Sequence, residues 1–185
     1  MRDYLAHEVR NVTVLGHSGA GKTAVLEAML HFTKATDRFG KTSEGSSIID
    51  YDPEEVRRGL SVYTSIVPIE WKDTKINFID TPGYLDFVGE MESGCAAGDN
   101  ILIVVGAKEG VQSGTQRAWE VAMEKKLPTI FFVNKVDEEH ASFDKAYQGL
   151  REAFGKSVFP FEVPILEYVD VIGSINFLRV IAWYF

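Results

Sequence analysis

Apolar residues along this chain gather in short continuous runs, and longer stretches with apolar residues at helical spacing lie between them. The runs cover residues 11–15, 75–79, 100–105 and 129–133. Continuous apolar character, rather than strict alternation, is typical of parallel strands that are covered on both faces. We therefore predict that the four runs are the central strands of one parallel sheet.

The stretches between the runs predict helices, one hairpin and one mobile loop. Residues 85–97 and 111–125 carry apolar residues at helical spacing. Residues 62–71, followed by the polar turn 72–74 and the next run, predict a hairpin whose first strand is an antiparallel edge strand. Residues 38–47, rich in Gly, Ser and Lys, predict the loop. The fold class is then α/β, with a doubly wound, mostly parallel sheet.

The pattern weakens towards the C-terminus. Residues 141–154 predict a helix, and residues 157–165 predict a strand that Pro160 and Pro164 interrupt. The apolar tail from residue 168 onward has no visible partner in the sequence to bury it. We interpret the chain as cut inside a domain.

The composition is that of an ordinary globular domain. Of the 185 residues, 45% are hydrophobic and 25% are charged. The net charge of −8 argues against generic binding to nucleic acid, which needs clustered Lys and Arg. No apolar run reaches the length of a membrane span, and the N-terminal residues do not resemble a signal peptide. Cys95 is the single cysteine, so we expect no internal disulfide and a reducing, cytoplasmic setting.

A glycine-rich segment of eight residues joins the first apolar run to a helical pattern that opens at Lys22. Its glycines let the backbone wrap closely around a polyphosphate, and its N–H groups and the helix N-terminus attract anions. Lys22 can reach the outer phosphates, and the Thr23 hydroxyl can bind Mg²⁺. A turn without a ligand is the alternative, but the full pattern favours a P-loop NTPase. The predicted phosphate-binding residues are Gly16, His17, Ser18, Gly19, Ala20, Gly21, Lys22 and Thr23.

A second segment follows the strand predicted at 75–79, at the strand end where α/β sheets bind ligands. Asp80 can hold Mg²⁺ through a water molecule, and the Gly83 N–H can donate to a γ-phosphate. A purely structural Pro-Gly turn is the alternative. The candidate ligand residues of this segment are Asp80, Thr81, Pro82, Gly83 and Tyr84.

A third segment, Asn134-Lys135-Val136-Asp137, follows the strand predicted at 129–133. The Asp137 carboxylate can accept hydrogen bonds from N1–H and the 2-amino group of guanine. Adenine lacks both donors, so the preference for guanine can reach roughly 10⁴. Lys135 can lie along the base, and Asn134 can tie this loop to the phosphate loop. Because this segment follows the other two in order, and each stands at a strand end, the three segments together predict recognition of GTP rather than ATP.

Residues 57–61 precede the predicted edge strand and end in a serine. The Ser61 hydroxyl can complete the Mg²⁺ shell when a γ-phosphate is present and leave after hydrolysis, as in a GTPase switch. A charged turn with a strand-starting serine is the alternative. The predicted metal ligands are thus Thr23, Ser61 and Asp80.

Together these segments resemble the N-terminal part of the GTP-binding domain of elongation factor G-like translational GTPases, from about residue 10 to the end of the chain. The resemblance implies GTP or GDP and Mg²⁺ as cofactors, hydrolysis by in-line attack of water, and the ribosome as partner of the full-length protein, in translocation, protection or recycling. It implies a GTP-binding core at 1–157 and, at 158–185, the start of an inserted subdomain, with the chain truncated before the last core strand. We expect a monomer without membrane association or direct DNA binding.

Three positions depart from the family pattern. Tyr84 stands where the family usually has a His that orients the attacking water, and a phenol is a poor acid or base at neutral pH. Gly19 stands where Asp is common, and Ser61 where Thr is usual. The catalytic candidates are Tyr84, Lys22 and Gly83. Two alternatives to a GTPase stay open: a GTP-dependent ribosome-binding module with negligible hydrolysis, and an inert truncated fragment.

Overall fold

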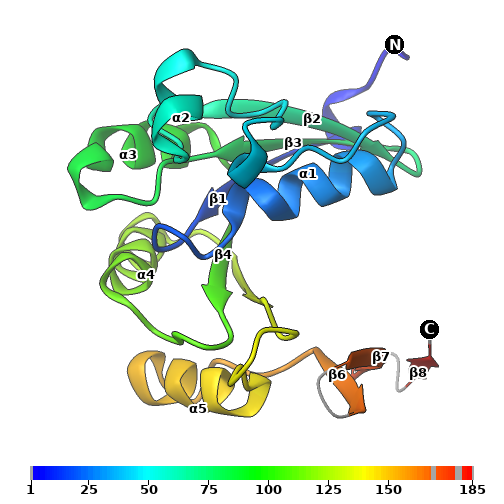
Figure 1. Ribbon diagram of the computed structural model, residues 1–185, viewed down its shortest axis with the longest axis vertical. Coiled ribbons are helices and arrows are strands. Elements are labelled where there is room, and N and C mark those ends of the chain that lie inside the picture. Colours follow the sequence, from blue (N-terminus) through cyan, green and yellow to red (C-terminus); the bar gives the residue numbers. More distant parts are fainter. Residues whose placement is uncertain (1, 168–169, 178–180, 185) are drawn as a thin grey trace.

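Five strands form the main sheet, in the order β2-β3-β1-β4-β5 (Figure 1). The computed structural model describes residues 2–167, 170–177 and 181–184. The neighbours β3, β1, β4 and β5 run parallel, and β2 pairs antiparallel with β3 at the edge. The predicted parallel sheet with an antiparallel edge strand is confirmed. The strands are β1 (Val9–Leu15), β2 (Ser65–Trp71), β3 (Thr74–Asp80), β4 (Asn100–Gly106) and β5 (Thr129–Asn134).

Helices cover both faces of this sheet, because adjacent residues of each central strand point to opposite faces. Val14 of β1 packs in a core with α1, whereas its neighbour Leu15 packs in a second core with α3, α4 and α5. The doubly wound arrangement is therefore confirmed. The α-helices are α1 (Lys22–Phe32), α2 (Pro53–Arg58), α3 (Val88–Ala97), α4 (Ser113–Lys125) and α5 (Phe143–Phe154), and the 3₁₀ turns are η1 (Ala6–Glu8), η2 (Thr42–Glu44) and η3 (Leu85–Phe87).

Two predicted elements begin later than expected because polar side chains bind the backbone ahead of them. The Ser142 hydroxyl accepts a hydrogen bond from Lys145 N at 3.3 Å, so α5 begins at Phe143 rather than at 141. The predicted edge strand 62–71 begins only at Ser65, since the preceding three backbone N–H groups donate to glutamate carboxylates. The helix predicted over 85–97 begins with η3 before α3.

The short helix α2 was not predicted from the sequence, although its ends carry recognisable signals. Asp52 accepts a hydrogen bond from Glu54 N at 2.8 Å, Pro53 occupies the first turn, and Gly59 closes the helix with φ 65°. An N-terminal Asp-Pro pair and a C-terminal Gly are typical helix boundaries. α2 lies over the end of the sheet that carries α3 (Figure 1).

A second, antiparallel sheet follows α5 in the order β6-β7-β8. The strand predicted over 157–165 is wrong for its first five residues, because β6 begins only at Glu162; Pro164 lies within it, opposite Ser174. A proline fits there because β6 is an outer strand of this sheet. The strands are β6 (Glu162–Glu167), β7 (Asp170–Asn176) and β8 (Ile181–Tyr184). Among the described residues, no helix has the length and apolar character needed to cross a membrane.

Candidate functional site

The glycine-rich loop turns sharply from β1 into α1. Gly16, Gly19 and Gly21 have φ values of 143°, 80° and 91°, a region that L side chains rarely adopt. A Cβ on Gly16 would overlap the Val104 carbonyl of β4, and one on Gly21 would overlap the Asn134 amide, whereas Gly19 faces open space. The loop is therefore a tight backbone turn beside β4 and β5.

Lys22 lies inside this loop rather than in solvent. Its ammonium donates to the carbonyls of Gly16 and His17, both at 3.3 Å. Burial lowers the pKa of Lys22, and the nearby carboxylates of Asp80 and Asp50 oppose that shift. The side chain thus places a positive charge between the phosphate loop and the acidic end of β3.

The predicted metal ligands Thr23, Ser61 and Asp80 come together at the start of α1. The Thr23 hydroxyl donates to Asp80 Oδ2 at 2.7 Å, and its oxygen lies 3.1 Å from Ser61 Oγ. Ser61 in turn donates to Asp50 Oδ2 at 3.1 Å. Asp50 was not predicted from the sequence as a site residue.

Asp80 is only 2% exposed, and its Oδ1 has no hydrogen-bond partner among the described residues. Burial raises the pKa of Asp80 to about 7, although Lys22 and Thr23 act in the opposite direction. An unpartnered buried carboxylate oxygen next to two hydroxyls fits a hard cation such as Mg²⁺. Within the described ranges no three His, Cys, Asp or Glu side chains cluster to hold a metal, so this candidate site depends on hydroxyl oxygens as well.

The segment after β3 lies against the phosphate loop. A Cβ on Gly83 would overlap the Lys22 ammonium and lie 2.7 Å from Ser18 N, so only glycine allows this approach. Thr81 is fully buried and donates to the Val14 carbonyl at 2.8 Å, which fixes the strand end. Pro82 is buried, whereas Tyr84 is 46% exposed and precedes η3.

The segment after β5 reaches the same loop from the other side. Asn134 Nδ2 donates to the Ala20 carbonyl at 3.0 Å, and Lys135 pairs with Glu138 at 3.1 Å. Val136 is partly buried, and Asp137 is exposed. The structure therefore brings the start of this segment onto the phosphate loop, and the base-reading role of Asp137 stays a prediction.

His17 anchors the phosphate loop to α4. Its Nδ1 accepts a hydrogen bond from Gly114 N at 3.3 Å, and a Cβ on Gly114 would lie 2.7 Å from His17 Cα. The close approach of the helix to the loop thus requires a glycine in α4. His17 therefore holds the phosphate loop against the start of α4.

Buried or partly buried glutamates hold residues 62–64, and sequence reasoning missed them. Glu55 accepts hydrogen bonds from Val62 N at 2.9 Å and Tyr63 N at 3.0 Å, and Glu90 of α3 accepts from Thr64 N at 2.8 Å. The segment that carries Ser61 is therefore tied to α2 and α3. Glu90 stands inside the stretch predicted as a helix, whereas Glu55 lies in α2, which the sequence did not predict.

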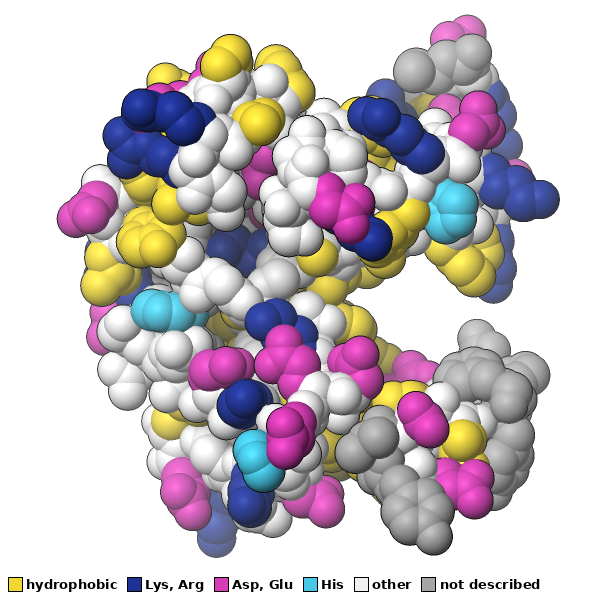
Figure 2. All heavy atoms as spheres, viewed as in Figure 1, with side chains coloured by type: hydrophobic (Ala, Val, Ile, Leu, Met, Phe, Trp, Pro, Cys, Tyr) yellow, Lys and Arg dark blue, Asp and Glu magenta, His cyan; other side chains and the backbone are white. Residues whose placement is uncertain are grey.

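Figure 2 shows the molecule hollowed between the part that carries α1 and α2 and the part that carries α4 and α5, with charged side chains on both walls.

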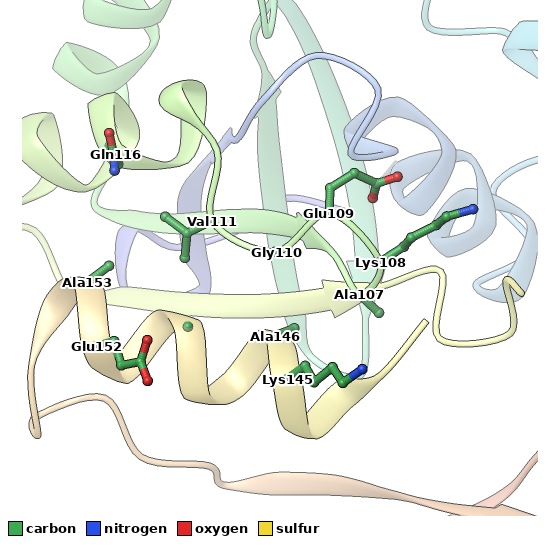
Figure 3. Close-up of a pocket in the computed structure, with 11 residues that line it drawn as sticks. Ala107, Lys108, Glu109, Gly110, Val111, Gln116, Lys145, Ala146, Glu152 and Ala153 are labelled. Atoms are coloured by element: carbon green, nitrogen blue, oxygen red, sulfur yellow. The ribbon is translucent and has the colours of Figure 1, made fainter. Parts of the chain in front are cut away.

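Two cavities lie away from the phosphate loop. One, of about 520 Å³, lies between the loop after β4 and α5, with Gln116 added by α4 (Figure 3). The other, of about 630 Å³, lies between β5, α5 and the second sheet. Neither contains the residues predicted to hold phosphate or metal.

Comparisons with known proteins agree on one family. Residues 7–182 match the model of the elongation factor Tu GTP binding domain. An elongation factor G-like protein of Thermotoga maritima is 36% identical over 171 residues, which cover 92% of this chain and 24% of that protein. A mitochondrial ribosome-releasing factor 2 of Anopheles gambiae is 35% identical over 170 residues, 92% of this chain and 23% of that protein.

The fold agrees with a solved structure as well. A crystal structure of a protein from Thermus thermophilus matches with a TM-score of 0.90 and 35% identity, over 96% of this chain and 27% of that one. The chain spans about a quarter of the length of these relatives.

Proposed function

Because this chain belongs to the family of elongation factor Tu GTP-binding domains, we propose that it binds GTP with Mg²⁺ and hydrolyses it to GDP and phosphate. The observation that carries this proposal is the meeting of three distant segments at the phosphate loop. Asn134 donates to Ala20, the Gly83 backbone lies against Ser18, and Thr23 contacts both Asp80 and Ser61. One nucleotide can contact all three segments.

Each segment has a chemical task in this proposal. The loop N–H groups and the Lys22 ammonium bind the phosphates and stabilise the charge that develops on them during in-line attack by water. The Gly83 N–H donates to the γ-phosphate. Bound Mg²⁺ neutralises phosphate charge, and Thr23, Ser61 and Asp80 are the residues that would hold it.

Tyr84 is the residue on which the rate depends. Its phenol stands beside Gly83 in sequence and is partly exposed, so it can hydrogen-bond a water near the γ-phosphate but is a weak base. This position favours, as a second candidate, a binding module that uses GTP occupancy and hydrolyses it very slowly. In both cases the names of the relatives support a ribosomal partner for the whole protein.

Competition binding tests the nucleotide assignment. A fluorescent GDP analogue is titrated into the chain, and unlabelled GTP and ATP are used as competitors. We expect saturable binding that GTP displaces and ATP does not. Equal competition by ATP would contradict the guanine assignment, and absence of saturable binding would favour an inert fragment.

Single-turnover hydrolysis, with and without ribosomes, separates a GTPase from a binding module. The matched variants are Tyr84→Phe, which removes the hydroxyl, and Tyr84→His, which supplies a better base. We expect the His variant to be fastest and the Phe variant slowest. If all three proteins leave GTP intact while still binding it, the binding module is the correct function.

A further inference from the structure

Glu27 is a fully buried carboxylate in the middle of α1, with 0% of its surface exposed. It follows Thr23 by one helical turn, so both side chains lie on the same face of α1. Its neighbours Val25, Leu26 and Leu30 belong to the apolar core. A buried charge among apolar residues is costly unless donors surround it.

Three donors of one short segment converge on a single oxygen of Glu27. Oε1 accepts hydrogen bonds from Ser47 Oγ at 2.7 Å, Ile48 N at 2.6 Å and Ile49 N at 3.2 Å. Ser47 Oγ also accepts from Ile49 N at 3.1 Å and Asp50 N at 3.0 Å. The segment 47–50 is therefore folded around this carboxylate.

The backbone at Gly40 packs against the same carboxylate. A Cβ on Gly40 would lie 2.7 Å from the Glu27 carboxyl carbon and overlap Oε2. Oε2 has no hydrogen-bond partner among the described residues. The backbone of residue 40 and the turn at 47–49 thus both contact the Glu27 carboxylate.

The segment held by Glu27 leads directly to the candidate metal site. Asp50 follows the anchored turn and accepts the hydrogen bond from Ser61, whose oxygen lies 3.1 Å from Thr23 Oγ1. Glu27 and Thr23 belong to one rigid helix. The helix therefore holds the segment between residues 47 and 61 at two points, one turn apart.

We propose that Glu27 is a positioning residue for the γ-phosphate-dependent state: it anchors residues 47–50 so that Asp50 holds the Ser61 hydroxyl at the cation site. This inference rests on the proposed function. GDP does not require Ser61 in that function, since Ser61 completes the metal shell only when a γ-phosphate is present. Loss of the anchor therefore weakens binding of GTP more than binding of GDP.

The test compares Glu27→Gln with wild type and with Glu44→Gln, a matched control whose carboxylate is exposed and pairs with Lys41. Affinities for GDP and for a non-hydrolysable GTP analogue are measured with Mg²⁺. Loss of charge-assisted hydrogen bonds predicts about tenfold weaker binding of the analogue in Glu27→Gln, with GDP affinity changed less than about twofold. The Glu44→Gln variant binds both nucleotides like wild type.

A second measurement does not depend on nucleotide. Amide hydrogen exchange of the nucleotide-free proteins reports directly on Ile48, Ile49 and Asp50, and we expect faster exchange there in Glu27→Gln, with unchanged exchange in the strands. Unchanged exchange at these amides overturns the proposal, and so does an equal loss of GDP and GTP affinity. Wild type that binds neither nucleotide overturns the proposed function instead, and the exchange result still decides whether Glu27 anchors the segment.

Discussion

The two ends of the candidate site differ in how far their side chains are buried and held by other residues. At the phosphate end, Lys22, Thr23 and Asp80 are buried and joined to one another and to the loop by hydrogen bonds or close charges. At the base end, one side-chain hydrogen bond from Asn134 holds the segment, and Asp137 is exposed. The phosphate end is therefore preorganised by the fold, and the base end presents its groups on an open surface.

Because of this difference, we expect the phosphate end to determine how tightly a nucleotide binds and the base end to determine which nucleotide is preferred. Preorganised charge and donors at the phosphate end act on any nucleoside triphosphate, because every such ligand carries the same phosphates. In the proposed function, the base end is the part that distinguishes guanine from adenine. Substitutions at the two ends are thus expected to change different quantities.

The largest effect is expected for Lys22→Ala. Removing the buried ammonium takes away the main positive charge at the phosphates, so we expect GDP and GTP binding to weaken by roughly 10²–10³-fold. Titration with the fluorescent GDP analogue measures this. Lys156→Ala, an exposed lysine after α5, is the control, and similar affinities in both variants would show that the phosphate end does not bind the ligand.

Asp137→Asn tests the base end. We expect the ratio of GTP to ATP affinity to fall by about 100-fold, less than for a fully buried recognition group because Asp137 is exposed. Competition titrations give the ratio, with Glu139→Gln as a control on the same exposed turn. A variant that loses affinity for both nucleotides equally would place Asp137 outside base recognition.

Asp80→Asn tests the burial of the phosphate end through the stability of the folded protein. Burial raises the pKa of Asp80 from 3.8 to about 7, so between these values the folded protein holds a proton that the unfolded chain has lost. The contribution of Asp80 to stability therefore falls as pH rises from about 4 to 7 and stays low above that.

We accordingly expect Asp80→Asn to melt about 10 °C above wild type at pH 8, and much closer to wild type at pH 4.5, when no nucleotide is present. The same variant should lose Mg²⁺-dependent nucleotide binding. Thermal unfolding at the two pH values checks the first statement. A constant difference between the proteins across this range would show that Asp80 does not titrate there.

The smallest effect is expected for Asn134→Ala, which removes the hydrogen bond to Ala20. One such neutral bond corresponds to about fivefold in affinity. Asn77→Ala, which removes a side-chain hydrogen bond to Asn11 in the sheet, is the matched control. If Asn134→Ala instead lost as much as Lys22→Ala, the base end would be as strongly coupled to the phosphates as the loop itself.

The parallel strands and the phosphate loop could be predicted because their signals are local. Continuous apolar runs mark central strands, and the glycines and Lys22 stand next to one another in the sequence. The late start of β6 shows the limit of such signals, since the apolar residues 158–161 belong to no strand in the part of the chain that the structure describes.

The side chains that complete the site could not be predicted in this way. Glu27 contacts residues 20 to 22 positions further along, and Glu90 contacts Thr64, which lies in the segment before β2. Neither spacing is periodic, so only the folded chain brings these groups together. α2 lies between the two cases, because its cap residues are local but its six residues are too short for a periodic pattern.

The glycines of the phosphate loop differ in whether a side chain could replace them. At Gly16 and Gly21 a Cβ would overlap neighbouring atoms, whereas Gly19 has φ 80° and no atom near the position of a Cβ. Asp and Asn are the side chains that best tolerate such a backbone. Over evolutionary time this single loop position can therefore gain or lose a negative charge beside the phosphates without rebuilding the turn around it.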